Sequence, residues 1–191
     1  MKKLTCFFLL LAATGSVSQV LSPIERMGIT IVNGPSRNVP QAGPTDFDAG
    51  PMVASILNVH YFPGLLDYGN GRYDYAETQL SYVINRPQYI EQNPRQGEIL
   101  STAHYTRGMI YFYHASGVGR HRLARADFEA AIQWNPRNLV AYLELSRVFS
   151  ELGLKEPAVS TIHRLLDFKP DKTIAEQAQA DLKKLGVKAK Q

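Results

Sequence analysis

Between residues 137 and 170, apolar side chains recur at intervals of three or four positions, in two runs separated by a short break. The first run places these residues on a single helical face: Tyr142, Leu145, Ser146 and Phe149. Gly153 then suits the end of a helix, and Pro157 suits the first turn of the next one. The pattern therefore predicts two antiparallel helices, the first over about residues 139–152.

Small residues accompany the large ones in this pair. Ser146 in the first helix and Ala158 in the second are the small positions among larger apolar side chains. We expect the two helices to cross closely there, because a Trp or Leu at either position would force them apart. The large side chains then fill the space around this contact.

A short sequence that ends in proline closes this unit, and a similar one closes the unit before it. The sequence "IQWNP" ends at Pro136 and "LDFKP" ends at Pro170, an interval of 34 residues. Self-similarity at this period indicates stacked helix pairs, each too small to bury its apolar face alone.

Residues 102–136 form the earlier unit, with one departure. Between Tyr111 and Ala124 it has four residues more than the later unit allows. These residues predict either an enlarged turn or a first helix that is longer by about one turn of 3.6 residues. Residues 63–88 follow the same pattern more weakly, and a longer connection separates them from the second unit.

Residues 172–186 predict a lone closing helix. Asp171 suits its N-terminal cap, Gly186 suits its end, and one side of it is polar. Terminal units of helical stacks have a polar outer face, because nothing packs against it.

Both later units resemble the tetratricopeptide repeat. Residues 137–170 match its pattern without gaps at Tyr142, Leu145, Ser146, Phe149, Gly153, Ala158, Ile162, Leu165 and Pro170. Residues 102–136 are similar to it through Gly108, Tyr111, Gly119, Ala124, Phe128, Ala131 and Pro136. The resemblance implies an all-α fold, a short right-handed α-solenoid of about three helix pairs with a C-terminal capping helix, preceded by an irregular N-terminal arm.

The N-terminus predicts export. Lys2 and Lys3 precede the apolar run "LTCFFLLLAA", and small residues follow it up to Ser18. This arrangement is typical of a bacterial signal peptide over residues 1–18 that is cleaved after Ser18, and it predicts a periplasmic protein. The run is shorter than the roughly 20 residues that span a bilayer. An uncleaved N-terminal anchor is the alternative.

Residues 19–50 are rich in proline and glycine, and we interpret them as an arm or linker before a helical domain of residues 51–191. That domain opens with an apolar helix candidate, "PMVASILNVHYF", which Pro51 could begin. We expect this helix to end or bend near Phe62, because Pro63 has no backbone N–H to donate.

Composition changes this picture little. The chain has 191 residues, 45% of them apolar and 20% charged, which suits one compact domain. The formal net charge of +4 falls to about +2 once Lys2 and Lys3 are removed with the signal peptide. This charge is too small to indicate a nucleic-acid partner. Removal of the signal peptide also removes Cys6, the only cysteine, which excludes disulfides and cysteine-ligated zinc from the mature chain.

The resemblance implies a binding surface as well. Tetratricopeptide stacks mostly bind peptide segments or other proteins on the concave face formed by the first helices of successive units. The residues of those helices that we expect to face this groove are Tyr105, Met109, Phe112, Tyr113, Leu143, Arg147, Ser150 and Glu151, joined by Gln177 and Asp181 on the closing helix. They predict an apolar, adaptable site with Arg147 available for one acidic contact.

One branch of the family clamps a C-terminal carboxylate with Lys, Asn and Arg at set groove positions. The corresponding residues here are Tyr105, Met109, Leu143 and Arg147, so the resemblance implies that this clamp is absent. An alternative for the aromatic residues is that they pack under the enlarged turn or against the arm, which would fill the groove from within the chain.

The favoured function is a non-enzymatic scaffold or adaptor of the bacterial cell envelope that binds a protein or peptide segment. The alternative is an accessory envelope subunit that contacts lipid head groups or polysaccharide through a basic surface, with the helix of residues 52–62 lying on the bilayer. The residues of that surface are Arg120, His121, Arg122 and Arg125, together with the basic C-terminal tail.

Patterns that carry chemistry do not occur. The five histidines lack the i, i+4 spacing beside a carboxylate that is typical of a helical zinc site. The serine of "ASGVG" is outside a G-x-S-x-G frame, and the mature chain has no thiol nucleophile. "GNGRYD" and "GVGR" lack the frame of a phosphate-binding loop and suit turns between helices. The sequence predicts no catalytic, cofactor-binding or metal site.

Overall fold

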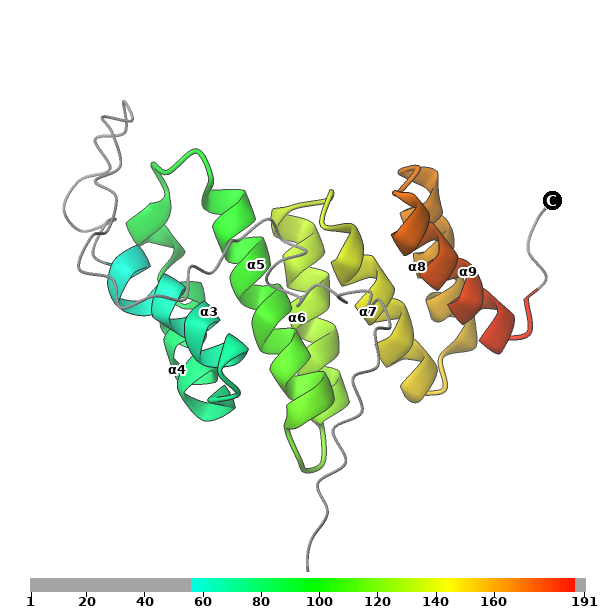
Figure 1. The fold of residues 1–191 in the computed structure, drawn as a ribbon, viewed down its shortest axis with the longest axis horizontal. Helices are drawn as coiled ribbons and strands as arrows, with labels where there is room; N and C mark the ends of the chain where they lie inside the picture. Colours follow the sequence, from blue (N-terminus) through cyan, green and yellow to red (C-terminus); the bar gives the residue numbers. More distant parts are fainter. Residues whose placement is uncertain (1–55, 188–191) are drawn as a thin grey trace, which may run out of the picture. The chain divides into compact units, whose positions relative to one another are not determined.

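The structure, a computed structural model, describes residues 56–187, which form a stack of helices (Figure 1). The elements in chain order are η1 (Leu57–Tyr61), α3 (Phe62–Gly69), α4 (Tyr73–Ile84), η2 (Pro87–Ile90), α5 (Gln96–Met109), η3 (Ile110–His114), α6 (Arg120–Trp134), α7 (Leu139–Glu151), α8 (Lys155–Asp167) and α9 (Lys172–Lys184). No strand occurs among residues 56–187. The predicted signal peptide and arm lie outside the described residues.

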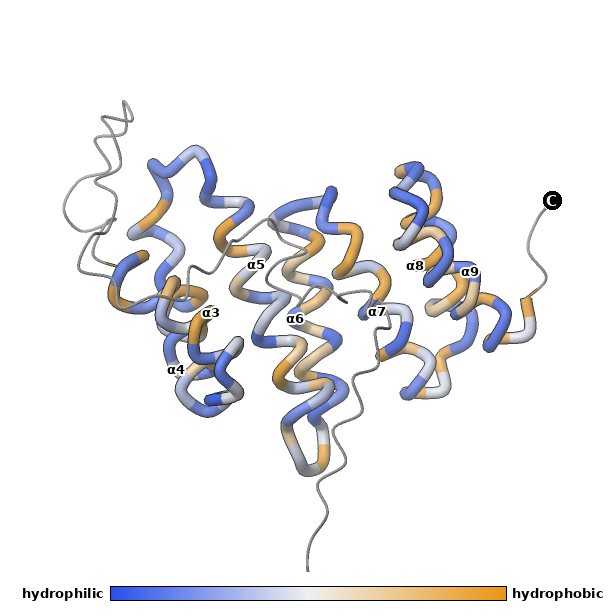
Figure 2. Tube along the Cα trace, viewed as in Figure 1, coloured by the Kyte–Doolittle hydropathy of each residue, from blue (hydrophilic) through white to orange (hydrophobic). Residues whose placement is uncertain are grey.

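Three helix pairs follow one another along the chain, and a final helix closes the stack. α3 packs against α4, α5 against α6, and α7 against α8, while α4 also contacts α5 and α6 contacts α7. α9 packs against both α7 and α8 (Figure 1). Hydrophobic and hydrophilic positions alternate along each helix (Figure 2), as expected when one face is buried. This is the predicted all-α solenoid of three pairs with a capping helix.

The third pair, α7 and α8, follows the sequence pattern closely. The Asn138 side chain caps α7 by accepting a hydrogen bond from the backbone N–H of Ala141 at 3.3 Å. Gly153 ends the helix in a left-handed conformation with φ of 73°, which a glycine adopts without strain. Ser146 and Ala158, the two predicted small positions, are both buried.

α9 completes the C-terminal core. Its first turn is capped by Asp171, whose carboxylate accepts a hydrogen bond from the backbone N–H of Ile174 at 2.9 Å, as the sequence predicts. The buried cluster that unites α7, α8 and α9 consists of Tyr142, Leu143, Ile162, Leu165, Ala178 and Leu182. α9 therefore covers an apolar face that a further repeat would cover in a longer stack.

In the second pair, α5 and α6 approach each other closely at Gly108. A Cβ atom at this position would lie 2.8 Å from Cε1 of the Phe128 ring, so a larger residue requires the helices or the ring to shift. α5 begins at Gln96, inside the segment that the sequence predicts as a connection. Ile99 and Leu100 are buried there and extend the apolar face of the helix toward its N-terminus.

The extra residues of the second unit lengthen its first helix, which was one of the two predicted outcomes. α5 continues directly into η3, a π-helical segment of five residues. The backbone N–H of Ala115 donates to the carbonyl of Ile110 at 2.8 Å, which is the i to i+5 hydrogen bond of a π-turn. A short turn then leads into α6.

The helix was predicted to end or bend near Phe62, and it does not end there. η1 passes into α3 there, and both Tyr61 and Phe62 have helical backbone angles. The N–H of Phe62 donates to the carbonyl of Leu57, five residues earlier, so the backbone has the wider π-helical turn at this point. Pro63 thus lies in the first turn of α3, where a missing N–H costs little.

Candidate functional site

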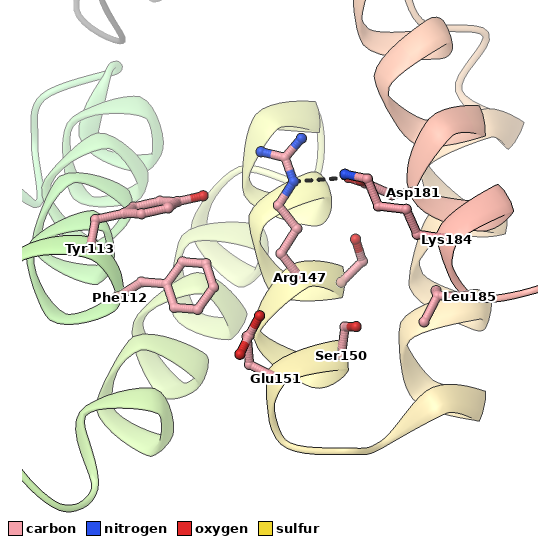
Figure 3. Close-up of a pocket in the computed structure, with 9 residues that line it drawn as sticks. Phe112, Tyr113, Arg147, Ser150, Glu151, Asp181, Lys184 and Leu185 are labelled. Carbon is pink, nitrogen blue, oxygen red and sulfur yellow. Dashed lines mark hydrogen bonds and ion pairs between the residues drawn. The ribbon is translucent and has the colours of Figure 1, made fainter.

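A cleft of about 240 Å³ opens between η3, α7 and the C-terminal end of α9. The lining residues are Phe112, Tyr113, Ser146, Arg147, Ser150, Glu151, Asp181, Lys184 and Leu185. Figure 3 shows the α7 side chains between the aromatic side chains of η3 and the side chains of α9. The cleft thus joins the first helices of two successive pairs to the closing helix, which is where the sequence predicts a groove.

Two aromatic side chains form one wall of the cleft. The ring centroids of Phe112 and Tyr113 are 4.6 Å apart in an edge-on arrangement, and Phe112 also packs edge-on against His121. Phe112 is buried, whereas 47% of Tyr113 is exposed. The Tyr113 ring therefore provides an accessible aromatic surface that Phe112 holds in place.

Glu144 lies beneath this wall with its carboxylate almost fully buried. Its Oε2 atom accepts a hydrogen bond from the Tyr113 hydroxyl at 2.6 Å, and its Oε1 atom accepts one from Arg147 at 2.8 Å. A buried carboxylate needs such partners, because water no longer solvates it. Glu144 therefore fixes the position of Tyr113 relative to α7.

Asp181 continues the chain of charges to α9. The Arg147 Nε donates to one of its carboxylate oxygens, and the Lys184 Nζ donates to the other, each at 2.8 Å (Figure 3). Arg147 thus bridges Glu144 and Asp181, and it ties α7 to the closing helix. The arrangement holds the walls of the cleft at a fixed separation.

The pKa shifts in this network follow from burial and from neighbouring charge. Burial raises the pKa of Glu144, and the positive charge of Arg147 opposes that rise. Burial and the nearby Glu144 raise the pKa of Tyr113. Burial alone would lower the pKa of Arg147, but Glu144 and Asp181 raise it above its ordinary value. Tyr113 is therefore a hydrogen-bond donor, and Arg147 a cation, throughout the neutral pH range.

The structure brings five of the eight predicted groove residues together at the cleft: Phe112, Tyr113, Arg147, Ser150 and Glu151. Asp181 joins them, as expected. The other three, Tyr105, Met109 and Leu143, are buried and do not line the cleft.

Two of these three residues belong to the packing of the fold. Leu143 is part of the C-terminal core, and the Tyr105 ring packs against Phe128 at a centroid distance of 5.8 Å. The helical spacing that suggested a groove stripe serves the core at these positions.

The predicted role of Arg147 needs correction. The sequence suggests an arginine that is available to an acidic partner, but both Glu144 and Asp181 already bind its guanidinium group. This residue stabilises the cleft, and its charge is compensated within the fold.

Three lining residues were not assigned to the groove from the sequence: Ser146, Lys184 and Leu185. Lys184 and Leu185 follow Asp181 by three and four positions, so they share its helical face, and this spacing could have indicated them. Ser146 was assigned to the helix contact, where its hydroxyl donates to the Leu143 carbonyl at 2.7 Å.

Most of the predicted basic surface has partners within the fold. Arg120 donates to the carbonyls of Phe112 and Ala115, at 3.1 and 3.3 Å, and thereby caps the C-terminal end of η3. Arg125 forms an ion pair with Glu129 and lies over the Phe149 ring. The edge-on contact with Phe112 holds His121. Among these four basic residues, Arg122 alone has no side-chain partner within residues 56–187.

A second charged cluster lies inside the second helix pair. Asp127 is buried and accepts hydrogen bonds from His104 and from two nitrogens of Arg107, each at 2.8 Å. Arg107 also donates to the Ser81 hydroxyl on α4 at 2.9 Å. This cluster joins α4, α5 and α6, and none of its members lines the cleft. His104 is thus an internal partner of Asp127.

The described part of the chain has a second hollow outside the cleft. A hollow of about 480 Å³ runs along α8 to Val187, lined by side chains of both charges. In residues 56–187, no group of three or more His, Cys, Asp or Glu side chains is placed to hold a metal ion. None of the helices described there has the length and apolar character needed to cross a membrane.

Comparison with known proteins agrees with the helical pattern. Residues 117–182 match the model of the tetratricopeptide repeat, which covers α6 to α9. No curated protein matches the chain. Among solved structures, a mutant of MamA is similar at 16% sequence identity and a TM-score of 0.37, over 69% of this chain and 84% of that chain. Over residues 117–182, which run from the start of α6 into α9, the chain is therefore similar to the tetratricopeptide repeat.

Proposed function

We propose that this protein is a non-enzymatic adaptor of the bacterial cell envelope, and that it binds a segment of a partner protein in the cleft between η3, α7 and α9. The observation that carries the proposal is the cleft itself. It is built from the first helices of two successive repeats, and tetratricopeptide repeat proteins generally use that side of the stack for protein–protein interaction.

The cleft has the chemical character of a peptide site. The exposed Tyr113 ring offers a rigid aromatic surface, and Leu185 on the opposite side offers an apolar one. Ser150 and Glu151 on α7 add polar groups that are open to solvent. A mixed lining of this kind suits a short segment with alternating apolar and polar side chains.

Capture of a C-terminal carboxylate is not part of this proposal. The cationic groups at the cleft, Arg147 and Lys184, both bind carboxylates of the chain itself. A carboxylate ligand would have to displace Asp181 or Glu144, which would leave a buried charge without its partner.

The proposed location rests on the sequence of residues 1–18. We expect the mature protein to begin at Gln19 and to be found in the periplasmic fraction. Mass measurement of the protein isolated from cells tests this expectation, because a chain that retains residues 1–18 would indicate an N-terminal anchor instead.

Binding can be tested by blocking the cleft. Ser150→Trp places a large side chain in the cleft at an exposed position, and Ser160→Trp makes the same change at an exposed position on α8 outside it. Each variant and the wild type would be used to isolate partners from an envelope extract. We expect Ser150→Trp to lose a partner that Ser160→Trp retains, with equal folding by circular dichroism. Identical partner sets for the two variants would contradict the proposal.

A further inference from the structure

The charges around the cleft are compensated with one exception. Arg147 is paired with Glu144 and Asp181, and Lys184 is paired with Asp181, at N to O distances of 2.8 Å. Glu151 also lines the cleft and is exposed, and it forms no ion pair within residues 56–187. One carboxylate therefore stands at the cleft with no cation to neutralise it.

The position of Glu151 makes its negative charge more effective. It is the last residue of α7, and the helix macrodipole places a partial negative charge at this end of the helix. A carboxylate is unfavourable at this end of a helix, whereas a cation is favourable there. The helix end and Glu151 therefore act in the same direction on a bound ligand.

The aromatic wall adds a second attraction for a cation. Figure 3 shows Phe112 on the side of the cleft that Glu151 faces, with Tyr113 next to it. Tyr113 is 47% exposed, and the faces of aromatic rings attract guanidinium and ammonium groups. Arginine stacks on aromatic rings and forms two parallel hydrogen bonds to a carboxylate, so it suits this site better than lysine.

From these observations we infer that the partner segment carries a positively charged side chain, arginine in preference to lysine, which binds between Glu151 and the Phe112–Tyr113 wall. An adjacent apolar side chain of the segment lies toward Leu185. This inference rests on the proposed function, since it assigns the chemistry of the ligand of that same cleft.

Selection from a display library of random peptides against the full-length chain tests the inference. We expect the selected peptides to be enriched in arginine at one position next to an apolar residue. A representative peptide and its copies with lysine, glutamine or glutamate at that position would then be titrated. The expected order of affinity is arginine, lysine, glutamine and glutamate, and raised salt should weaken the first two most.

Glu151→Gln removes the charge and keeps the size of the side chain. We expect it to lower the affinity for the arginine peptide by about fivefold, as is usual for a partly exposed ion pair. The affinity for the glutamine peptide should not change. Glu91→Gln is the matched control, because Glu91 is exposed and does not line the cleft. It should bind every peptide as the wild type does.

The outcomes separate the inference from the proposed function. Suppose that Ser150→Trp excludes the selected peptides. If these peptides lack a basic residue, or bind the wild type and Glu151→Gln with equal affinity, the inference is overturned and the cleft remains a binding site. Failure to select any peptide that Ser150→Trp excludes would overturn both.

Discussion

The second and third helix pairs have the same architecture and fill it with different side chains. Gly108 and Ser146 occupy corresponding positions in the two first helices, and Phe128 and Ile162 do so in the second helices. In the second pair the smaller first-helix residue, Gly108, is combined with the larger second-helix residue, Phe128. Gly108 leaves space for the Phe128 ring, while Ser146 belongs to the pair with the smaller Ile162. Close helix contact is therefore maintained by the summed volume of the two positions.

Polar residues differ more between the two pairs. Arg107 and Asp127 form the buried ion pair of the second pair, and the corresponding residues of the third pair are Leu145 and Thr161. The third pair has its charges elsewhere on α7, where Glu144 and Arg147 reach outward to η3 and α9. Buried charge thus joins helices inside the second pair, whereas in the third pair it shapes a cleft between neighbouring elements.

The largest effect should come from breaking the internal ion pair. Asp127→Thr, which introduces the residue of the third pair, leaves Arg107 and His104 without their acceptor. We expect a loss of about 3 kcal/mol in the free energy of unfolding, measured by urea denaturation. The double variant with Arg107→Leu should recover most of this loss, because paired apolar replacements of a buried ion pair are often nearly neutral. If the double variant is no more stable than Asp127→Thr alone, the Leu and Thr of the third pair cannot replace the ion pair of the second pair.

The exchange of small and large residues gives the next largest effect. Gly108→Ser should lower the free energy of unfolding by about 2 kcal/mol, because its Cβ would overlap the Phe128 ring. Adding Phe128→Ile reproduces the residues of the third pair, and we expect the double variant to be less destabilised than the sum of the two single variants. Additive effects would argue against direct coupling of these positions.

A smaller gain is expected at Thr106, which corresponds to Glu144 of the third pair. Its hydroxyl is buried and has no hydrogen-bond partner in the described part of the chain, unlike the carboxylate of Glu144. Thr106→Val keeps the shape and removes the polar group, so we expect the free energy of unfolding to rise by about 1 kcal/mol. A loss of stability in thermal and urea unfolding would indicate that the hydroxyl has a partner.

The smallest effect concerns η3, which the third pair lacks. His114 stacks on the Tyr73 ring with centroids 3.7 Å apart, and burial lowers the pKa of His114 below 6.5. The unfolded chain then takes up the proton more readily, so the contribution of His114 is complete above about pH 6.5 and is lost as the pH falls. His114→Phe should abolish this part of the pH dependence of unfolding, and His163→Phe, at an exposed position on α8, should retain it. Equal pH profiles for the two variants would contradict this account.

The sequence predicts the repeat architecture well because that architecture depends on local signals. Helical spacing, the caps at Asn138 and Asp171, and the small residues at the helix contacts are all encoded within a few residues of one another. The lengthened first helix of the second unit was one of two outcomes that the four extra residues allow. The π-helical turn before Pro63 was not predicted, since its wider hydrogen bonding has no clear signature in a single sequence.

The cleft was predicted only in part because spacing on a helix does not reveal what faces it. Tyr105 and Leu143 have the spacing of groove residues, yet both are buried. The pairing of Arg147 depends on Glu144 three residues before it and on Asp181 in α9. Whether these side chains are buried or paired depends on contacts between helices that are distant in sequence. The local sequence pattern does not encode those contacts.

The central claim is that a partner segment lies between η3, α7 and α9. It is tested most directly by photo-crosslinking in living cells, with benzophenone-alanine placed either at position 150 in the cleft or at position 160 on α8. We expect position 150 to give a crosslinked adduct of one discrete mass with another protein, and we expect Tyr113→Ala to reduce its yield. The account is contradicted if position 160 gives the same adduct with equal yield, or if position 150 gives none while position 160 does.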